Sequence, residues 1–384
     1  MTDWKTQYSA NIMKSAALPS AELVRGEGAR VWDSEGNEYL DFLAGIAVLS
    51  LGHAHPALVN AVSTQIATLG HVSNYFATPP QLALAERLLR LTGGDRVYFC
   101  NSGAEAIEAG IKLARRTGRP RILSLQNSFH GRTMGSLSLT GKPALREPFE
   151  PLLPNVEHID STIAALEAAI GPDVSALFVE PIKGEAGVID LPEGYLAAAR
   201  EITAKHGVLL ILDEIQTGAG RTGSWFAFQS EGIVPDAMAL AKGIGAGVPI
   251  GALVAYGAAA DLLVAGQHGS TYGGNPLVTA AADAVLAEIE SAGLVANAAA
   301  RGAEIRAALG GLPLVEEIRG QGLLIGVGLS KPVAPAVVAS AAAEGLIVNA
   351  PNDTSIRLAP PLIITEADVA EFTTKFTKAL EANA

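Results

Sequence analysis

Lys242 and the residues around it have the types and order needed for chemistry on amines. Lys242 ends the apolar segment 237–241 and is followed at once by a glycine-rich stretch. Desolvation disfavours an ammonium ion, so a lysine in such a place has a lowered pKa and becomes a nucleophile that can form a Schiff base with an aldehyde. The alternative interpretation is a lysine at a helix end, which caps carbonyl groups before Gly243.

Asp213 is the strongest partner for this lysine, because it ends the all-apolar segment 208–212. A carboxylate buried there needs a cation, and a protonated pyridine nitrogen is one. Keeping that nitrogen protonated makes the ring electron-poor, so that it can absorb the carbanion formed when an amino acid loses its α-proton. Gln216, three residues on, is placed to hydrogen-bond a ring oxygen. The rival is a strand-end aspartate that binds Mg²⁺, but the supporting phosphate-loop pattern GxxxxGK[ST] does not occur.

Small and hydroxyl residues in two segments suit a phosphate. Ser102 and Glu105 have the spacing of a capping box, which predicts that a helix begins there. The free amides of its first turn and its dipole form an anion site, and Gly103 lets a ligand approach the backbone closely. Ser270 and Thr271, in a glycine-rich turn, are further hydroxyl donors for a phosphate or carboxylate. An ordinary helix cap and an ordinary turn are the alternatives.

Three other segments suit a flat ring and carboxylate substrates. Phe129 and Arg132 can stack on a ring and pair with a carboxylate; the alternatives are a core phenylalanine and a surface ion pair. Glu185 lies between glycine-containing turns, from which it either reaches a site or is exposed. Arg357 lies in a short apolar segment, where its guanidinium needs a carboxylate of a substrate or of an acid in the same domain.

Together these features favour pyridoxal 5′-phosphate over any other cofactor. A phosphate cup, a ring stacker, an acid for the pyridine nitrogen and a Schiff-base lysine follow one another along the chain. Each comes directly after a predicted strand. In open α/β sheets, that carboxyl edge is where ligands bind.

The middle of the chain alternates strand-like and helix-like segments. Strands are predicted at 97–100, 121–125, 175–180 and 207–213, and helices at 104–116, 161–170 and about 195–206. Near-continuous apolar strands separated by helices indicate a mostly parallel sheet with both faces covered. The fold class is therefore predicted to be α/β.

The two ends of the chain differ from this pattern. We expect short strands over 24–43, one long helix over about 276–309, strand-like pieces at 323–329 and 356–358, and a final helix after Thr365. These elements predict a small α+β domain from residues 1–50 and 276–384. Residues 51–275 are predicted to form the large α/β domain.

Composition limits the classes of partner. The 384 residues are 49% hydrophobic with a net charge of −12, which allows two domains and argues against nucleic-acid backbones and anionic membranes. The single cysteine, Cys100, excludes an internal disulfide and fits a reducing cytosol. The start lacks the apolar core of a signal peptide, and residues 243–260 are too rich in glycine for a spanning helix. We expect a cytoplasmic protein without a metal site.

With these motifs in place, the sequence resembles the fold-type I, class III aminotransferases, and within them most closely those that act on acetylornithine in arginine biosynthesis. The similarity runs from about Val24 to Val369. It rests on the strings NSGAEAIEAGIKLAR, FHGRTMGSLS, FEPLLP, LDEIQTGAGRTG, LAKGIGAGVPIGA, HGSTYGGNP and IRLAPPLIIT.

The resemblance implies a role for each residue that faces the cofactor. Lys242 would bind the cofactor covalently and then carry the proton, with Asp213 on the pyridine nitrogen and Gln216 on the ring oxygen. Phe129 would stack on the ring. Further contacts to the cofactor would come from Ser102, Gly103, Ala104, Glu214 and Ile215.

The resemblance also implies how substrates and a second subunit take part. Thr271 would complete the phosphate cup from the neighbouring subunit, which makes a homodimer necessary. Arg132 would bind a substrate carboxylate with Ser270 close by, and Arg357 would bind the α-carboxylate of glutamate or 2-oxoglutarate. Glu185 would pair with Arg357 when the other substrate is bound and swing away for glutamate, because an unpaired charge there is costly.

Ile46 bears on the choice of amine. Ornithine aminotransferases have a tyrosine at this place, which grips the free α-amino group of ornithine, whereas isoleucine favours a substrate whose α-nitrogen is acylated. The expected activity is ping-pong transfer of the 5-amino group of N-acetylornithine to 2-oxoglutarate. The alternatives are a related amine (succinyldiaminopimelate, succinylornithine or 4-aminobutyrate), an aminomutase or decarboxylase on the same scaffold, and a catalytically silent binding protein.

Overall fold

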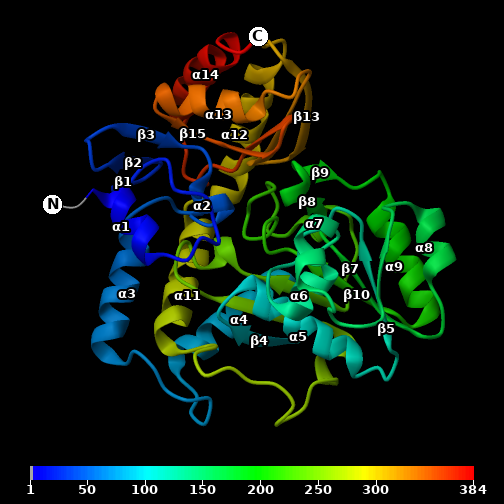
Figure 1. Cartoon of the computed structure of the whole chain (residues 1–384). Coiled ribbons are helices and arrows are strands. Elements are labelled where there is room, and N and C mark those ends of the chain that lie inside the picture. Colours follow the sequence, from blue (N-terminus) through cyan, green and yellow to red (C-terminus); the bar gives the residue numbers. More distant parts are fainter. Residues whose placement is uncertain (1–2) are drawn as a thin grey trace.

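A seven-stranded sheet forms the centre of the computed structural model, which describes residues 3–384 (Figure 1). In sheet order, its strands are β4 (Arg96–Cys100), β12 (Gly251–Ala255), β11 (Ala237–Leu240), β10 (Leu209–Asp213), β7 (Val174–Val179), β5 (Arg121–Leu125) and β6 (Val156–Ile159). Neighbouring strands are parallel, except that β12 runs antiparallel to both β4 and β11. The α/β fold with a mostly parallel sheet is therefore confirmed.

Helices cover both faces of this sheet, as its continuous apolar strands predict. The helices that pack on or beside it are α4 (Pro79–Thr92), α5 (Gly103–Arg115), α6 (Met134–Leu139), α8 (Ile163–Ala169) and α9 (Tyr195–His206). In β10, Leu210 belongs to a buried cluster with Leu196 of α9, whereas Ile211 belongs to a second cluster with Ile107 of α5. Successive side chains of a strand point to opposite faces, so α5 and α9 lie on opposite sides of the sheet.

Strand pairing brings the carboxyl ends of β10 and β11 together. Asp213, the last residue of β10, is in register with Ala239 of β11. Lys242 follows shortly after the end of β11. Because the two strands are parallel, Asp213 and Lys242 leave the sheet at the same edge.

The two ends of the chain lie side by side above this sheet (Figure 1). One small sheet contains β1 (Leu23–Glu27), β2 (Arg30–Asp33), β3 (Glu38–Asp41) and β15 (Leu346–Ile347), with β3 and β15 parallel. A second contains β13 (Val315–Gln321), β14 (Leu324–Leu329), β17 (Ser355–Leu358) and β16 (Asn349–Asn352). The short strands predicted near both termini are confirmed. The domain boundaries at residues 50 and 276 remain a prediction.

The single long helix predicted over about 276–309 is wrong. The segment forms two helices, α11 (Pro276–Ser291) and α12 (Leu294–Leu309). Between them, Gly293 has φ 64°, a left-handed conformation that glycine adopts readily and that a right-handed helix cannot contain. The final helix begins as predicted, because the Thr365 side chain caps α14 (Glu366–Glu381).

The remaining elements are short and surround the large sheet and the terminal sheets. They are α1 (Trp4–Asn11), α2 (Ala44–Ala47), α3 (Pro56–Thr68), α7 (Pro143–Arg146), η1 (Glu147–Phe149), β8 (Ile182–Lys183), η2 (Gly184–Ala186), β9 (Ile189–Asp190), α10 (Ala227–Ser230), η3 (Lys242–Ile244), η4 (Gly257–Asp261) and α13 (Ala334–Ala343). All four residues of α2 have positive φ, from 49° to 67°, so α2 is a left-handed turn. No helix within residues 3–384 is long and apolar enough to cross a membrane.

Candidate active site

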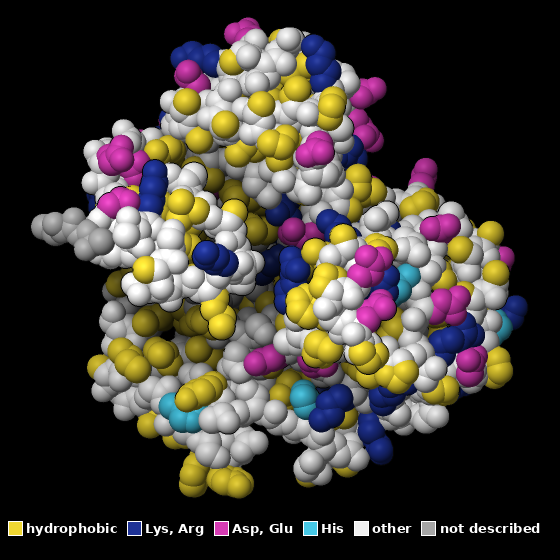
Figure 2. All heavy atoms as spheres, in the orientation of Figure 1, with side chains coloured by type: hydrophobic (Ala, Val, Ile, Leu, Met, Phe, Trp, Pro, Cys, Tyr) yellow, Lys and Arg dark blue, Asp and Glu magenta, His cyan; other side chains and the backbone are white. Residues whose placement is uncertain are grey.

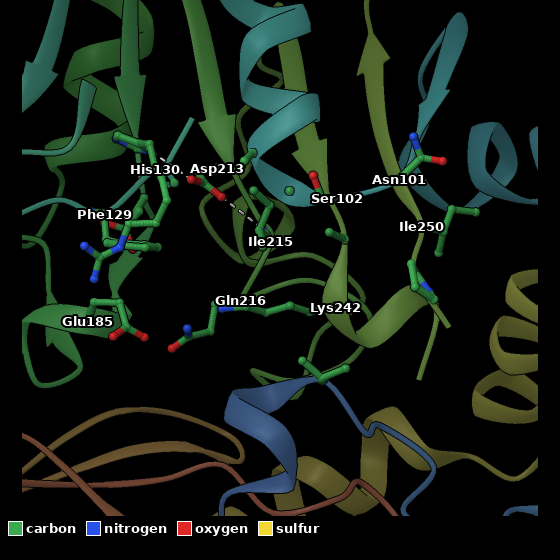
Figure 3. Close-up of a pocket in the computed structure, with 18 of the residues that line it drawn as sticks. Asn101, Ser102, Phe129, His130, Glu185, Asp213, Ile215, Gln216, Lys242 and Ile250 are labelled. Atoms are coloured by element: carbon green, nitrogen blue, oxygen red, sulfur yellow. Dashed lines mark hydrogen bonds and ion pairs between the residues drawn. The ribbon is translucent and has the colours of Figure 1, made fainter. Parts of the chain in front are cut away.

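A cavity of about 400 Å³ opens at the carboxyl edge of the central sheet (Figure 3). It is lined by the ends of β4, β10 and β11, by the segments after β5 and β7, and by Val48 beyond α2. Ten of the predicted site residues line it: Ser102, Gly103, Ala104, Phe129, Arg132, Glu185, Asp213, Ile215, Gln216 and Lys242. Residues widely separated in the sequence therefore meet in one place.

Asp213 lies in this cavity with its carboxylate already held on two sides. Its Oδ1 accepts the backbone N–H of Ile215 at 3.1 Å, and its Oδ2 lies 2.7 Å from Nδ1 of His130 (Figure 3). An ionised carboxylate only accepts hydrogen bonds, so Nδ1 of His130 is the donor. Both side chains are buried, and an anion in such a place still lacks a full positive partner.

Lys242 enters the same cavity from the end of β11 (Figure 3). Its backbone has φ 45°, and its carbonyl accepts the N–H groups of Gly245 and Ala246 at 2.9 and 3.2 Å. A positive φ at a non-glycine residue is strained and is held by such surroundings. Burial lowers the pKa of Lys242, although the attraction of Glu185 and Asp213 opposes this, so more of the amine is free at neutral pH.

The first turn of α5, where the sequence predicts an anion site, lines the cavity. The Ser102 side chain caps the helix by accepting the N–H of Glu105 at 3.2 Å. The other half of the predicted capping box is wrong, because the Glu105 carboxylate accepts the N–H of Asn101 at 2.6 Å instead of that of Ser102. A Cβ on Gly251 would lie 2.4 Å from the Ser102 carbonyl oxygen, so only glycine lets β12 pass this turn.

Phe129 and Arg132 form one side of the cavity. The Arg132 guanidinium lies 5.6 Å from the centre of the Phe129 ring. The backbone N–H of Phe129 donates to Oε2 of Glu180 at 2.7 Å, and the N–H of Gly184 donates to Oε1 at 3.4 Å. Glu180 thus ties the segment of Phe129 to that of Glu185. Burial raises the pKa of Glu180 to about 7, against the attraction of His130.

Arg357 lies behind the cavity and forms an ion pair with Glu185. Its side chain is 1% exposed and that of Glu185 is 26% exposed. Arg357 also donates to Oδ1 of Asn349 at 3.1 Å and to Oε1 of Gln216 at 3.4 Å. Burial by itself raises the pKa of Glu185, but the charges of Arg357, Lys242 and Lys142 and the hydrogen bond from Arg357 outweigh it, so the pKa is lowered.

Besides Arg357, three predicted site residues lie outside the cavity lining. The Glu214 carboxylate is buried and accepts bonds from the Thr217 hydroxyl at 2.5 Å and the Phe228 N–H at 2.8 Å, so it caps α10. Ser270 accepts the side-chain N–H of Asn101 at 2.9 Å, at the rim of the cavity. Thr271 is exposed. Ile46, in the left-handed turn, does not line the cavity either. Val48, two residues later, does line it.

Two titratable residues that line the cavity were not predicted, His130 and Glu180. Both stand in motifs that drew attention for a neighbour, Phe129 and Glu185. The available signal was their position directly after a predicted strand, where a polar residue reaches the ligand edge of the sheet. Their partners, Asp213 and the two backbone N–H groups, depend on the strand order.

The donor set of the cavity fits a phosphorylated pyridine aldehyde. The α5 amides and Ser102 suit a phosphate, Asp213 suits a ring cation, Phe129 provides an aromatic wall and Lys242 provides an amine. The volume is in the range of small-molecule sites. Within residues 3–384 no group of three or more His, Cys, Asp or Glu side chains could hold a metal ion.

Comparisons with known proteins agree with this chemistry. Residues 12–380 match the family model Aminotransferase class-III. The chain is 52% identical over 384 residues to a protein of Mycolicibacterium smegmatis named acetylornithine aminotransferase, covering 99% of this chain and 98% of that one. It is also 52% identical over 370 residues to the acetylornithine aminotransferase of Streptomyces coelicolor, with 95% and 92% covered.

Solved structures show the same fold. The ornithine aminotransferase of Toxoplasma gondii ME49 is 36% identical, with a TM-score of 0.95 and 99% of this chain and 94% of that one covered. An amine transaminase from an uncultivated Pseudomonas species, solved in a pyridoxal-phosphate-bound form, is 30% identical, with a TM-score of 0.91 and 97% and 98% covered.

Proposed function

The chain belongs to the class III aminotransferases, and from that premise we propose that it is an N-acetylornithine:2-oxoglutarate 5-aminotransferase of arginine biosynthesis that uses pyridoxal 5′-phosphate. The observation that carries this proposal is the entry of Lys242 and Asp213 into one cavity from neighbouring parallel strands. Curated relatives with the same name, 52% identical over nearly the whole chain, support the substrate.

The residues around the cavity divide the work of transamination. When bound, pyridoxal 5′-phosphate supplies an aldehyde for the amino group and an electron-poor ring for the negative charge left by proton loss. Lys242 provides the amine that holds this group and then moves the proton at the substrate carbon. Asp213, fixed by His130, would hold the proton on the ring nitrogen of the bound cofactor. Phe129 packs on the ring, and the first turn of α5 binds the phosphate.

Arg357 and Glu185 allow one site to accept two different substrates. Glutamate presents an α-carboxylate beside its amino group, and Arg357 binds it. N-acetylornithine reacts at its far end, where no carboxylate is present, so Glu185 then neutralises Arg357. The ion pair between these side chains supports this role. Arg132, on the Phe129 side, binds the other carboxylate of the substrate.

We propose a homodimer in which Thr271 serves the neighbouring cavity. Thr271 is exposed and lies outside the cavity of its own chain. The loop after α3 exposes Tyr75 by 88% and Phe76 by 67%. Figure 2 shows further hydrophobic side chains on the same lower left part of the surface. A contiguous apolar surface of this kind is typical of a subunit interface.

The specificity is tested by comparing amines. The holoenzyme is assayed with 2-oxoglutarate and, in turn, N-acetylornithine, succinyldiaminopimelate, succinylornithine, 4-aminobutyrate and ornithine. We expect kcat/KM to be at least about tenfold higher for N-acetylornithine than for ornithine, because Ile46 offers no partner to a free α-amino group and kcat/KM measures discrimination. We propose a cytoplasmic location, which the single cysteine supports.

Lys242→Ala is the control for this assay, and we expect it to lose turnover by at least about a thousandfold. Normal turnover by Lys242→Ala contradicts the mechanism. A wild-type enzyme that prefers 4-aminobutyrate contradicts the substrate. A wild-type enzyme that forms no glutamate from 2-oxoglutarate with any amine contradicts transamination itself.

A further inference from the structure

The proposed function leaves the Glu185 carboxylate without a partner in one half-reaction. When the α-carboxylate of glutamate binds Arg357, Glu185 must leave it. The Glu185 side chain is mostly buried, and a buried charge without a partner is costly. A second cation within its reach would remove that cost.

The backbone that carries Glu185 is fixed, so its side chain alone has to move. The carbonyl of Glu185 accepts a hydrogen bond from Nζ of Lys142. The carbonyl of Ala186 accepts Nδ2 of Asn352 at 3.1 Å. The carbonyl of Gly187 accepts Nη2 of Arg319 at 3.0 Å. Three successive carbonyls are thus held by side chains from different parts of the chain.

Three cations act on the Glu185 carboxylate: Arg357, Lys242 and Lys142. During the glutamate half-reaction Arg357 binds the substrate, and Lys242 serves the cofactor and the proton. Lys142 is the one of these three that neither task occupies. Within residues 3–384 its ammonium makes one hydrogen bond, to the Glu185 carbonyl, and no ion pair. Two of its three N–H groups therefore remain for a carboxylate.

Lys142 also lies within reach of Glu185 and beside open space. Its ammonium is at hydrogen-bond distance from the carbonyl of Glu185 itself, so it lies within about one side-chain length of that residue's Cα. Lys142, Lys183 and Ala186 line a second cavity of about 420 Å³ next to the Glu185 segment. Glu185 itself lines the first cavity, where Figure 3 shows its side chain below Phe129.

We propose that Lys142 is the second cation of a two-position switch, which receives the Glu185 carboxylate when the α-carboxylate of glutamate or 2-oxoglutarate takes Arg357. This inference rests on the proposed function and adds a residue that sets its specificity. Lys142 holds the Glu185 carbonyl in both positions of the switch, and in one of them its remaining N–H groups also receive the Glu185 carboxylate. It is a positioning residue, because it acts on the substrate only through Glu185.

Single-turnover kinetics of the two half-reactions tests this. Holoenzyme of the wild type, Lys142→Met and Lys142→Arg is mixed with glutamate or with N-acetylornithine, and the cofactor absorbance is followed. We expect Lys142→Met to lower kcat/KM for glutamate by about tenfold or more, mainly through KM, and to leave N-acetylornithine within about twofold. Lys142→Arg should stay near the wild type, because it keeps the charge.

Lys183→Met is the matched control. Lys183 lines the same second cavity, but its ammonium donates to the Gln126 carbonyl and the Ser161 hydroxyl, both at 2.6 Å, and not to Glu185. Lys183→Met should therefore change kcat/KM by the same factor for glutamate and for N-acetylornithine. Should Lys142→Met fail to bind cofactor, Lys142→Gln provides the neutral side chain with a polar end.

A double-mutant cycle with Glu185→Ala decides whether Lys142 acts through Glu185. In the Glu185→Ala background, loss of Lys142 should not change kcat/KM for glutamate further. A persisting loss there, an equal loss in both half-reactions, or an unchanged glutamate half-reaction in Lys142→Met overturns the inference. Failure of the proposed function has a different result from these outcomes, because the wild type itself would then show no half-reaction with N-acetylornithine.

Discussion

The carboxylate of Asp213 is held in place by a neighbouring buried side chain, that of His130. His130 donates to it at 2.7 Å, and the far nitrogen of His130, Nε2, is buried without a hydrogen-bond partner among residues 3–384. The histidine therefore fixes one rotamer of Asp213 and aims its free lone pairs at the cavity.

Replacing His130 by leucine tests this role. A hydrogen bond to a charged group is worth about 1.5–3 kcal/mol, so we expect kcat to fall roughly ten- to a hundredfold and the cofactor to dissociate more readily. Steady-state kinetics and titration of the apoenzyme with cofactor measure both. His158→Leu is the control, because His158 is a partly buried histidine, on β6, outside the cavity. Equal effects of the two substitutions would mean a general packing defect.

Single residues were the easiest part of the site to predict. Asp213 ends one apolar segment and Lys242 follows another, and the two together point to one site, whereas Lys242 alone is also explained as an ordinary helix end. His130 and Glu180 were missed because their partners come from other strands and become neighbours only when the sheet is ordered. The resemblance implied that Glu214 contacts the cofactor, whereas its carboxylate accepts backbone N–H groups at the start of α10.

At the scale of elements, an ion-pair network joins β2 to the last helix, α14. Arg30 donates to Glu371 at 2.7 Å and lies 3.4 Å from Asp368. The hydrogen bond from Arg30 lowers the pKa of Glu371 to about 2. The two termini are therefore fastened to one another by charges as well as by the stacked rings of Phe42 and Phe372, whose centres are 4.4 Å apart.

Glu371→Gln should destabilise the protein at pH 7 by about 0.5–1 kcal/mol, since both partners are partly exposed and screened by water. A carboxylate with a lowered pKa stabilises the fold above its unfolded value of 4.5, and this contribution is lost as the pH falls toward 2. The difference in the free energy of unfolding between variant and wild type should therefore shrink between pH 5 and pH 3. Denaturant unfolding at several pH values measures it, and a difference that grows as the pH falls contradicts the assignment.

Helices and strands were predicted well where one hydrophobic pattern ran through a whole segment, and poorly where two elements meet. The strands 121–125 and 207–213 were recognised from continuous apolar residues. The long helix was placed across Gly293 because alanine-rich sequence continues on both sides of it. A single glycine costs a helix about 1 kcal/mol, so the sequence alone does not decide between a tolerated glycine and a break.

At the scale of the whole molecule, the loop after α3 exposes large apolar side chains, and the fold of a single chain does not explain this exposure. Tyr75 and Phe76 lie on it with most of their surface in water. No local pattern predicted this exposure, because it concerns a partner and not the fold of one chain. The proposed homodimer gives these side chains a place to be buried.

Phe76→Glu should therefore weaken the dimer. A charge in the centre of an apolar interface costs several kcal/mol, so we expect a monomer at micromolar concentration, with weaker cofactor binding because Thr271 no longer reaches the neighbouring site. Light scattering after size exclusion and cofactor titration measure both. Ile163→Glu is the control, because Ile163 is also exposed and begins α8, on the far side of the molecule (Figure 1). A monomeric wild type would refute the proposal.

The order of strands in the central sheet fixes the spacing of the three groups that face the ligand. The anion site follows β4, the lysine follows β11 and the aspartate ends β10, with β12 between the first two. Neighbouring strands are spaced about 4.8 Å apart, so the strand order sets how far apart the backbones that carry these three groups lie. The first turn of α5 and the two side chains reach from those positions toward one ligand. Substitution of side chains does not change the spacing of these strands, because such a change would require a strand to be added to the sheet or removed from it.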